Sequence, residues 1–171
     1  RGLKNLPTTA DALPYVNDAA TRALFSKTGV LSPVELKSRY EVYAEIYVMS
    51  IDVEAKLVVE MAKTIIYPAA MSYLSDLADT SSSLSAMGIV LDSTTAKTIA
   101  SETNAMMAAV TKLADASAKE DFASTDEHMQ YCANVICGLM VEVRTHADIL
   151  ETEISDEQWP LPKYREMLFI K

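Results

Sequence analysis

The sequence predicts an all-α fold, namely an antiparallel helical bundle of long helices with irregular straps at both ends. Three observations support this prediction. The 171 residues include only four glycines and six prolines, so few positions can interrupt a helix. No proline occurs between Pro68 and Pro160. Apolar residues recur at steps of three and four over long stretches, which is the spacing of one helix face.

The composition indicates one globular domain and excludes several kinds of partner. Half of the residues are hydrophobic and 23% are charged, as in ordinary folded proteins. The formal net charge is −9, so no nucleic-acid partner is expected, because binding to phosphates requires a basic patch. No run of about eighteen apolar residues is present, so no membrane contact is expected either. Cys132 and Cys137 would point roughly 140° apart on an α-helix, which argues against a disulfide and agrees with a reducing, cytoplasmic setting.

The first fifteen residues are expected to form a linker or strap. The stretch "NLPTTADALP" ends in Pro14 and contains Pro7, and residues that precede proline avoid the α region, so an extended or turn-like backbone is expected. The chain starts with Arg1 instead of Met, which suggests a piece of a longer protein. A short helix is then predicted from about Asn17 to Thr28, with Gly29 as its left-handed C-terminal cap.

A long helix is predicted from Pro33 to Ile66. Ser32 and Glu35 have the spacing of a capping box, and proline is well tolerated at the first helical position. Pro68 is expected to kink the chain before the helix continues. The tyrosines of the apolar face could form a stacking surface, but the helical spacing favours a place in the core. That face contains Leu36, Tyr40, Tyr43, Tyr47, Ile51, Ala55, Val58, Ala62 and Ile65.

Two later helices are predicted to form an antiparallel hairpin. The first is capped near Asp92 or Ser93, and the second begins with a capping box of Ser124 and Glu127. Both carry a repeat of 3.5 residues, which is typical of helices in a left-handed bundle. The repeat positions are Ile99, Thr103, Met106, Val110, Leu113 and Ser117 in the first helix, and Met129, Ala133, Ile136, Met140, Val143, Ala147, Leu150 and Ile154 in the second.

No catalytic, cofactor-binding or metal-binding residue is predicted. A di-iron site in a bundle needs Glu-x-x-His motifs, whereas Thr125 and Val143 stand three residues before His128 and His146. With glycines only at positions 2, 29, 88 and 138, the chain has no Gly-rich phosphate loop. The sequence therefore indicates a structural or binding role.

The last thirteen residues, "WPLPKYREMLFIK", are interpreted as a docking strap. They follow a third expected capping box, Ser155 with Gln158. The tryptophan would anchor the chain, the two prolines would hold an extended spacer, and a short helical turn would follow up to Leu168. The same residues could instead cover the bundle's own core, and both alternatives stay open. The candidate docking residues are Trp159, Pro160, Pro162, Tyr164, Arg165 and Phe169.

Three stretches together with this ending resemble one known family. "NLPTTADALP", "GVLSPVELKSRYEVYAEIY" and "IDVEAKLVVEMAKTIIYPAA" occur in order before "WPLPKYREMLF". They are similar to the C-terminal region of type III glutamine synthetases. The resemblance implies a cytoplasmic enzyme that joins ammonia to glutamate at the expense of ATP, with magnesium or manganese, in a dodecamer of two stacked hexameric rings.

In such an enzyme the catalytic domain would lie upstream of Arg1, so no catalytic residue is carried over to this chain. Residues 1–15 would be the strap from that domain, 16–158 the helical bundle and 159–171 the docking strap, within one domain overall. The chain alone would be inactive and have a structural or assembly role. Its expected partners are the upstream catalytic domain and neighbouring subunits. The competing hypothesis is a free-standing acidic helical bundle that acts as an interaction or sensor module.

Overall fold

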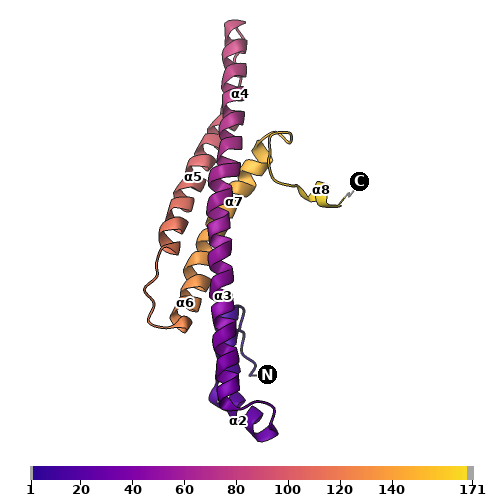
Figure 1. Ribbon diagram of the computed structural model, residues 1–171. Helices are drawn as coiled ribbons and strands as arrows, with labels where there is room; N and C mark the ends of the chain where they lie inside the picture. The colour runs from indigo at the N-terminus through magenta and orange to yellow at the C-terminus, as the bar shows by residue number, and fades with distance from the viewer. Residues whose placement is uncertain (1, 169–171) are drawn as a thin grey trace. The chain divides into compact units, whose positions relative to one another are not determined.

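The computed structural model describes residues 2–168, and these residues form helices and connecting loops without a β-strand (Figure 1). The predicted all-α class with long helices is thereby confirmed. Along these residues, no helix is both long enough and apolar enough to cross a membrane. The elements are α1 (Thr9–Ala12), the 3₁₀ turn η1 (Leu13–Asn17), α2 (Ala19–Thr28), α3 (Pro33–Met61), the π-helical turn η2 (Ala62–Ile66), α4 (Tyr67–Ala86), α5 (Thr94–Ser117), α6 (Thr125–Tyr131), the π-helical turn η3 (Cys132–Ile136), α7 (Cys137–Glu153) and α8 (Tyr164–Leu168).

The segment before α2 is helical instead of extended. Leu13 adopts right-handed helical angles (φ −60°, ψ −38°) although Pro14 follows it. Pro14 lies in the first turn of η1, where its missing N–H is not needed. Ala10 and Leu13 are buried, so packing outweighs the local preference of the residue before proline. The expectation of an extended or turn-like backbone is therefore wrong for residues 9–14.

The predicted short helix and its C-terminal cap at Gly29 are confirmed in α2. The helix begins at Ala19, two residues after the expected start at about Asn17, and the Asp18 side chain caps it by accepting a hydrogen bond of 2.7 Å from the Thr21 N–H. Gly29 ends it with a φ of 68°, a conformation that favours glycine.

The chain stays helical from Pro33 to Ala86, through η2. The predicted capping box is present, because the Ser32 N–H donates to Glu35 Oε2 (2.8 Å) and the Glu35 N–H donates to Ser32 Oγ (3.3 Å). η2 lies directly before Pro68, which occupies the first turn of α4. In this wider turn the Tyr67 N–H donates to the Ala62 carbonyl, whereas Pro68 has no N–H to donate. The kink itself stays a prediction.

The buried face of α3 differs from the predicted one at one tyrosine. Leu36, Tyr40 and Ala55 are buried as expected, but Tyr43 is 50% exposed and Ala44 is fully buried. The small side chain of Ala44 lets neighbouring elements approach α3 closely. The interpretation of Tyr43 as a core residue is therefore wrong.

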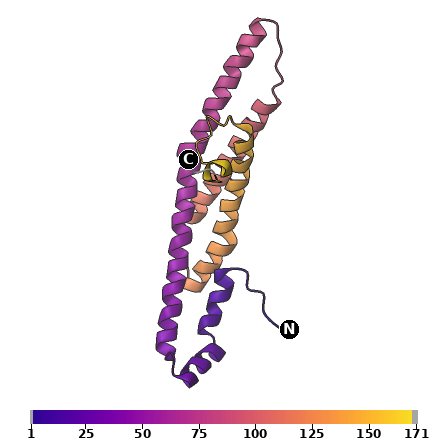
Figure 2. The same ribbon diagram turned by 90° about the vertical axis from the view of Figure 1, so that its right-hand side faces the viewer.

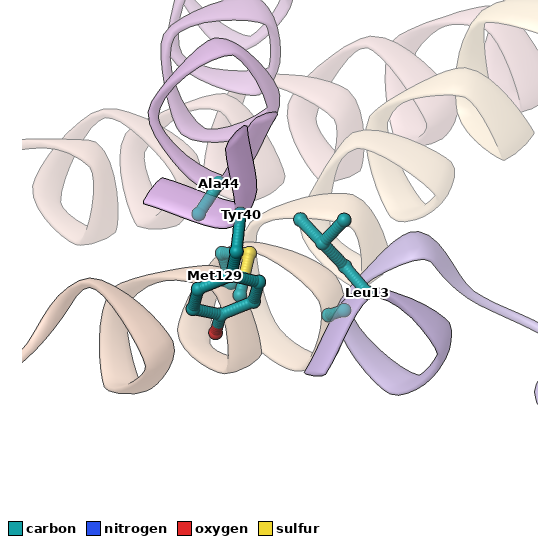
Figure 3. Packing of buried hydrophobic residues seen from close by; sticks show 5 residues of the cluster. Leu13, Tyr40, Ala44 and Met129 are labelled. Atoms are coloured by element: carbon teal, nitrogen blue, oxygen red, sulfur yellow. The ribbon is translucent and has the colours of Figure 1, made fainter. Parts of the chain in front are cut away.

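The chain divides into two compact units, and unit 1 comprises Arg1–Lys56 and Leu113–Leu139. Its buried cluster joins α1, η1, α3 and α6, as Figure 3 shows from close by. Gln130 Nε2 donates to the Ala10 carbonyl (3.0 Å), and the Tyr40 hydroxyl donates to Asp126 Oδ1. The first contact fixes the N-terminal segment on α6, and the second joins α3 to α6. The cluster contains Ala10, Leu13, Tyr40, Ala44 and Met129.

Unit 2 comprises Leu57–Lys112 and Met140–Lys171. Here α5 and α7 run side by side in opposite directions (Figure 2), since Lys112 Nζ pairs with Glu142 Oε1 (2.8 Å) and His146 Nδ1 with Glu102 Oε2 (2.7 Å). The predicted antiparallel hairpin is confirmed. Its seam buries repeat positions that had been predicted from spacing alone, namely Ile99, Thr103, Met106, Val110, Val143 and Leu150.

Of the two later capping boxes, one forms in part and one does not form. Ser124 Oγ accepts from the Glu127 N–H (3.2 Å), but the Glu127 carboxylate accepts from the N–H of Ala123 instead of Ser124. At the end of α7, the Gln158 N–H donates to the Ser155 carbonyl in a turn (3.0 Å). The third predicted capping box is therefore wrong, and the Gln158 side chain binds elsewhere.

Candidate docking surfaces

The described residues contain no cluster of side chains of the kind that holds a metal ion. No three His, Cys, Asp or Glu side chains among them come close enough together to hold a metal ion. The His128 ring stacks on Phe122 with centroids 4.0 Å apart, and His146 pairs with Glu102. Both histidines are thus used in packing or ion pairing within the domain.

The two cysteines lie in a setting that the sequence does not reveal. The π-helical turn η3 begins at Cys132, and the Cys137 N–H donates to the Cys132 carbonyl. The α-helical angle predicted between them therefore does not apply. Both are free, and burial raises the pKa of the Cys132 thiol to about 11 and the pKa of the Tyr47 hydroxyl beside them to about 12. A thiol with a raised pKa is a poor nucleophile, so this cluster is a packing feature.

A cavity of about 20 Å³ lies beside the cysteines in unit 1. Ser117 and Tyr131 are among the residues that line it, and Ser117 Oγ is buried without a hydrogen-bond partner. This volume is enough for about one water molecule and too small for a substrate.

A larger open groove, with a volume of about 480 Å³, lies between α3 and the connection from α5 to α6. Its apolar part includes Met49 and Phe122, and it has two carboxylates, Glu45 and Glu120. Lys119 is near, but its ammonium group lies 4.7 Å from the Phe122 ring centroid and the same distance from that of Tyr131. The groove is lined by Glu45, Val48, Met49, Glu120, Phe122, Ser124, Thr125 and His128.

Beside the groove, α3 carries an apolar stripe that no described residue covers. Val42, Ile46, Met49 and Val53 follow one another at steps of four, three and four, so they share one side of the helix. They are 49%, 54%, 66% and 56% exposed. Met49 belongs to both the stripe and the groove, which makes the two surfaces continuous. The stripe was not predicted from the sequence, although its spacing equals that of the buried face.

The tail residues that were predicted to form a docking strap differ in their burial. Trp159 is only 8% exposed, and its backbone N–H donates to the Ser155 carbonyl (2.9 Å). Gln158 Nε2 donates to Asp76 Oδ2 (2.5 Å), which ties this turn to α4. Trp159 thus packs within unit 2, whereas Pro160 and Pro162 are exposed.

The short helical turn predicted after the prolines is confirmed as α8. The Lys163 N–H donates to Glu166 Oε2 (3.0 Å) at its start, and Met167 and Leu168 are 56% and 73% exposed. Tyr164 and Arg165 lie in α8, but their side chains are outside the described part, as is the whole of Phe169. The docking role of these residues stays a prediction.

Comparisons with known proteins agree on one family. The family model described as "Glutamine synthetase C-terminal domain" matches residues 1–85. The chain is 33% identical to a type-3 glutamine synthetase of Dictyostelium discoideum and 31% identical to a glutamine synthetase of Bacteroides fragilis, over the full chain in both cases. It is 29% identical to a glutamine synthetase of Butyrivibrio fibrisolvens over 99% of the chain. The matches span 24%, 25% and 25% of these proteins, about a quarter of their length.

Proposed function

Because the chain belongs to the family of glutamine synthetase C-terminal domains, we propose that it is the non-catalytic helical domain of a type III glutamine synthetase. Its role is in structure and assembly. The whole enzyme ligates ammonia to glutamate with ATP and magnesium or manganese, in the cytoplasm and as a dodecamer. The glutamate, nucleotide and metal sites belong to the remaining part of the enzyme.

The observation that carries this proposal is that 99–100% of the chain matches only about a quarter of each relative. The groove on α3 supports a binding role, because apolar side chains line it together with the carboxylates of Glu45 and Glu120. The alternative of a free-standing interaction or sensor module has no separate observation in its favour.

The partners proposed for the domain are the catalytic domain of its own subunit and neighbouring subunits. In the tail, Trp159 holds the chain on unit 2, and the exposed Met167 and Leu168 are available for contact beyond it. An anchored start followed by exposed apolar residues is the arrangement that a strap between domains requires.

The test compares the full-length enzyme with a form that lacks residues 159–171. We expect the purified 171-residue chain to be helical by circular dichroism and to release no phosphate from ATP in the presence of glutamate and ammonia. We expect the truncated full-length enzyme to sediment as smaller species in analytical ultracentrifugation. Turnover by the isolated chain, or normal assembly of the truncated enzyme, would contradict the proposal.

Two substitutions distinguish a role of the tail in assembly from a role in the core of the domain. Trp159→Ala removes a buried ring, so it should destabilise the isolated chain by about 3–5 kcal/mol. Leu168→Asp changes a side chain that is 73% exposed, so it should leave the stability of the isolated chain unchanged and weaken assembly of the full enzyme. If both variants assemble normally, the tail serves only to cover the core of its own domain.

A further inference from the structure

We propose that the stripe on α3 and the groove beside it form one docking surface for a basic amphipathic helix. The helix comes from the part of the synthetase polypeptide outside these 171 residues, so this source rests on the proposed function. All residues of the surface belong to unit 1.

The first step is the geometry of the apolar part. Val42, Ile46, Met49 and Val53 are at least 49% exposed and cover three turns of one helix. Phe122 lines the groove together with Met49, so the apolar part continues into the groove. A continuous strip of this kind beside a groove is the surface that an amphipathic helix binds through residues at i, i+3, i+4 and i+7.

The second step is the charge of the groove. Glu45 and Glu120 line it, and neither has an ion-pair partner among the described residues. The neighbouring cation, Lys119, faces the rings of Phe122 and Tyr131. Two unpaired carboxylates next to apolar side chains favour an occupant with lysine or arginine beside its apolar face.

The third step is the choice among occupants. A second copy of this surface would bring the same carboxylates together, and each chain has a formal net charge of −9, so like charges oppose self-pairing. The relatives are about four times as long as the matched region. A helix from that remaining polypeptide is covalently linked to the domain, so its effective concentration is high and modest complementarity suffices.

The binding chemistry is tested on the 171-residue chain with two synthetic helical peptides of eighteen residues. Both have leucine at i, i+3, i+4 and i+7, with lysine at the other positions of one peptide and glutamate in the other. Isothermal titration calorimetry at low salt should give at least tenfold tighter binding of the lysine peptide. Equal binding of the two peptides would overturn the proposed charge preference.

Variants then place the binding on this surface. Ile46→Glu should weaken binding of the lysine peptide at least tenfold, whereas Val34→Glu, also on α3 and 78% exposed, should leave it unchanged. The double variant Glu45→Lys and Glu120→Lys should reverse the preference between the peptides. Its matched control carries the same charge change at two other exposed acidic residues, Asp79→Lys and Glu157→Lys. An equal loss in the matched control would show that net charge alone, not this groove, attracts the peptide.

The source of the helix is tested in the full-length enzyme with the photoreactive residue p-benzoylphenylalanine in place of Met49. Mass spectrometry should identify a cross-link to a segment outside the 171 residues that is rich in lysine or arginine. A cross-link to residues 1–171 of a second copy would overturn the assigned source. The proposed assembly role is judged separately, by sedimentation of the enzyme without residues 159–171.

Discussion

Replacement of Met129 by alanine tests the core of unit 1. Met129 is fully buried in the cluster around Tyr40 and Ala44 (Figure 3). Met49 is the matched control, because it is also a helical methionine of unit 1 but is 66% exposed. The same substitution is thus made once at a buried position and once at an exposed position.

The expected magnitudes follow from burial. A fully buried methionine side chain contributes about 1.5–3 kcal/mol through burial alone. The cavity that remains raises the cost of a change to alanine to about 2–5 kcal/mol. Met129→Ala should therefore lower the free energy of unfolding by about 3 kcal/mol. For Met49→Ala only about a third of the burial contribution is at stake, so its loss should stay below about 1 kcal/mol.

The assay is urea and thermal unfolding followed by circular dichroism at 222 nm. For a chain of 171 residues, a loss of about 3 kcal/mol corresponds to a decrease in Tm of roughly 6–12 °C. Met49→Ala should change Tm by no more than roughly 4 °C. The reasoning is refuted if the two variants are equally destabilised, or if Met129→Ala costs less than about 1 kcal/mol.

Three further predictions concern single groups. Tyr40→Phe removes the hydroxyl that donates to Asp126 and should cost about 1–2 kcal/mol in urea unfolding; an unchanged midpoint would contradict this. Burial raises the pKa of Cys132 from 9.0 to about 11, so at pH 8 it should react with a disulfide reagent about 100-fold more slowly in the native chain than in urea; equal rates would contradict it. A hydrogen bond from the Thr21 N–H lowers the pKa of the Asp18 carboxyl below its ordinary 3.8. The stabilisation by the Asp18 cap should thus be full above pH 3.8 and be lost as pH falls through the lower pKa of the folded state. Asp18→Asn should keep the cap but lack this acid-dependent decrease in Tm. Equal acid sensitivity of the two proteins would contradict this prediction.

Local sequence rules predicted the elements that depend on local chemistry. The left-handed Gly29, the capping box of Ser32 with Glu35 and the buried seam positions of α5 were all predictable. Each depends on one residue type at a fixed spacing, and the signal needs no knowledge of distant residues.

The features that the sequence did not predict depend on packing between distant segments. Leu13 is helical before a proline because its side chain is buried in the core of unit 1. Ala44 is buried where Tyr43 was expected, because neighbouring elements pack closely against α3 at this position. The π-helical turn at Cys132 has no residue signature of its own. The stripe on α3 has the same spacing as the buried face, so periodicity alone could not tell which face is covered.

The two apolar sides of α3 connect the fold with its proposed role. A helix at the surface of a globular protein has one apolar face, whereas a helix that is apolar on several sides is normally buried on all of them. Leu36, Tyr40 and Ala44 are covered by unit 1, but Ile46 and Met49 stay open along the same helix. If a free-standing bundle were the functional form, these side chains would remain an aggregation liability. Under the proposed function, polypeptide outside these 171 residues covers them, since the relatives are about four times as long as the matched region. The exposed side of α3 therefore favours a domain completed by the rest of its enzyme over an independent module.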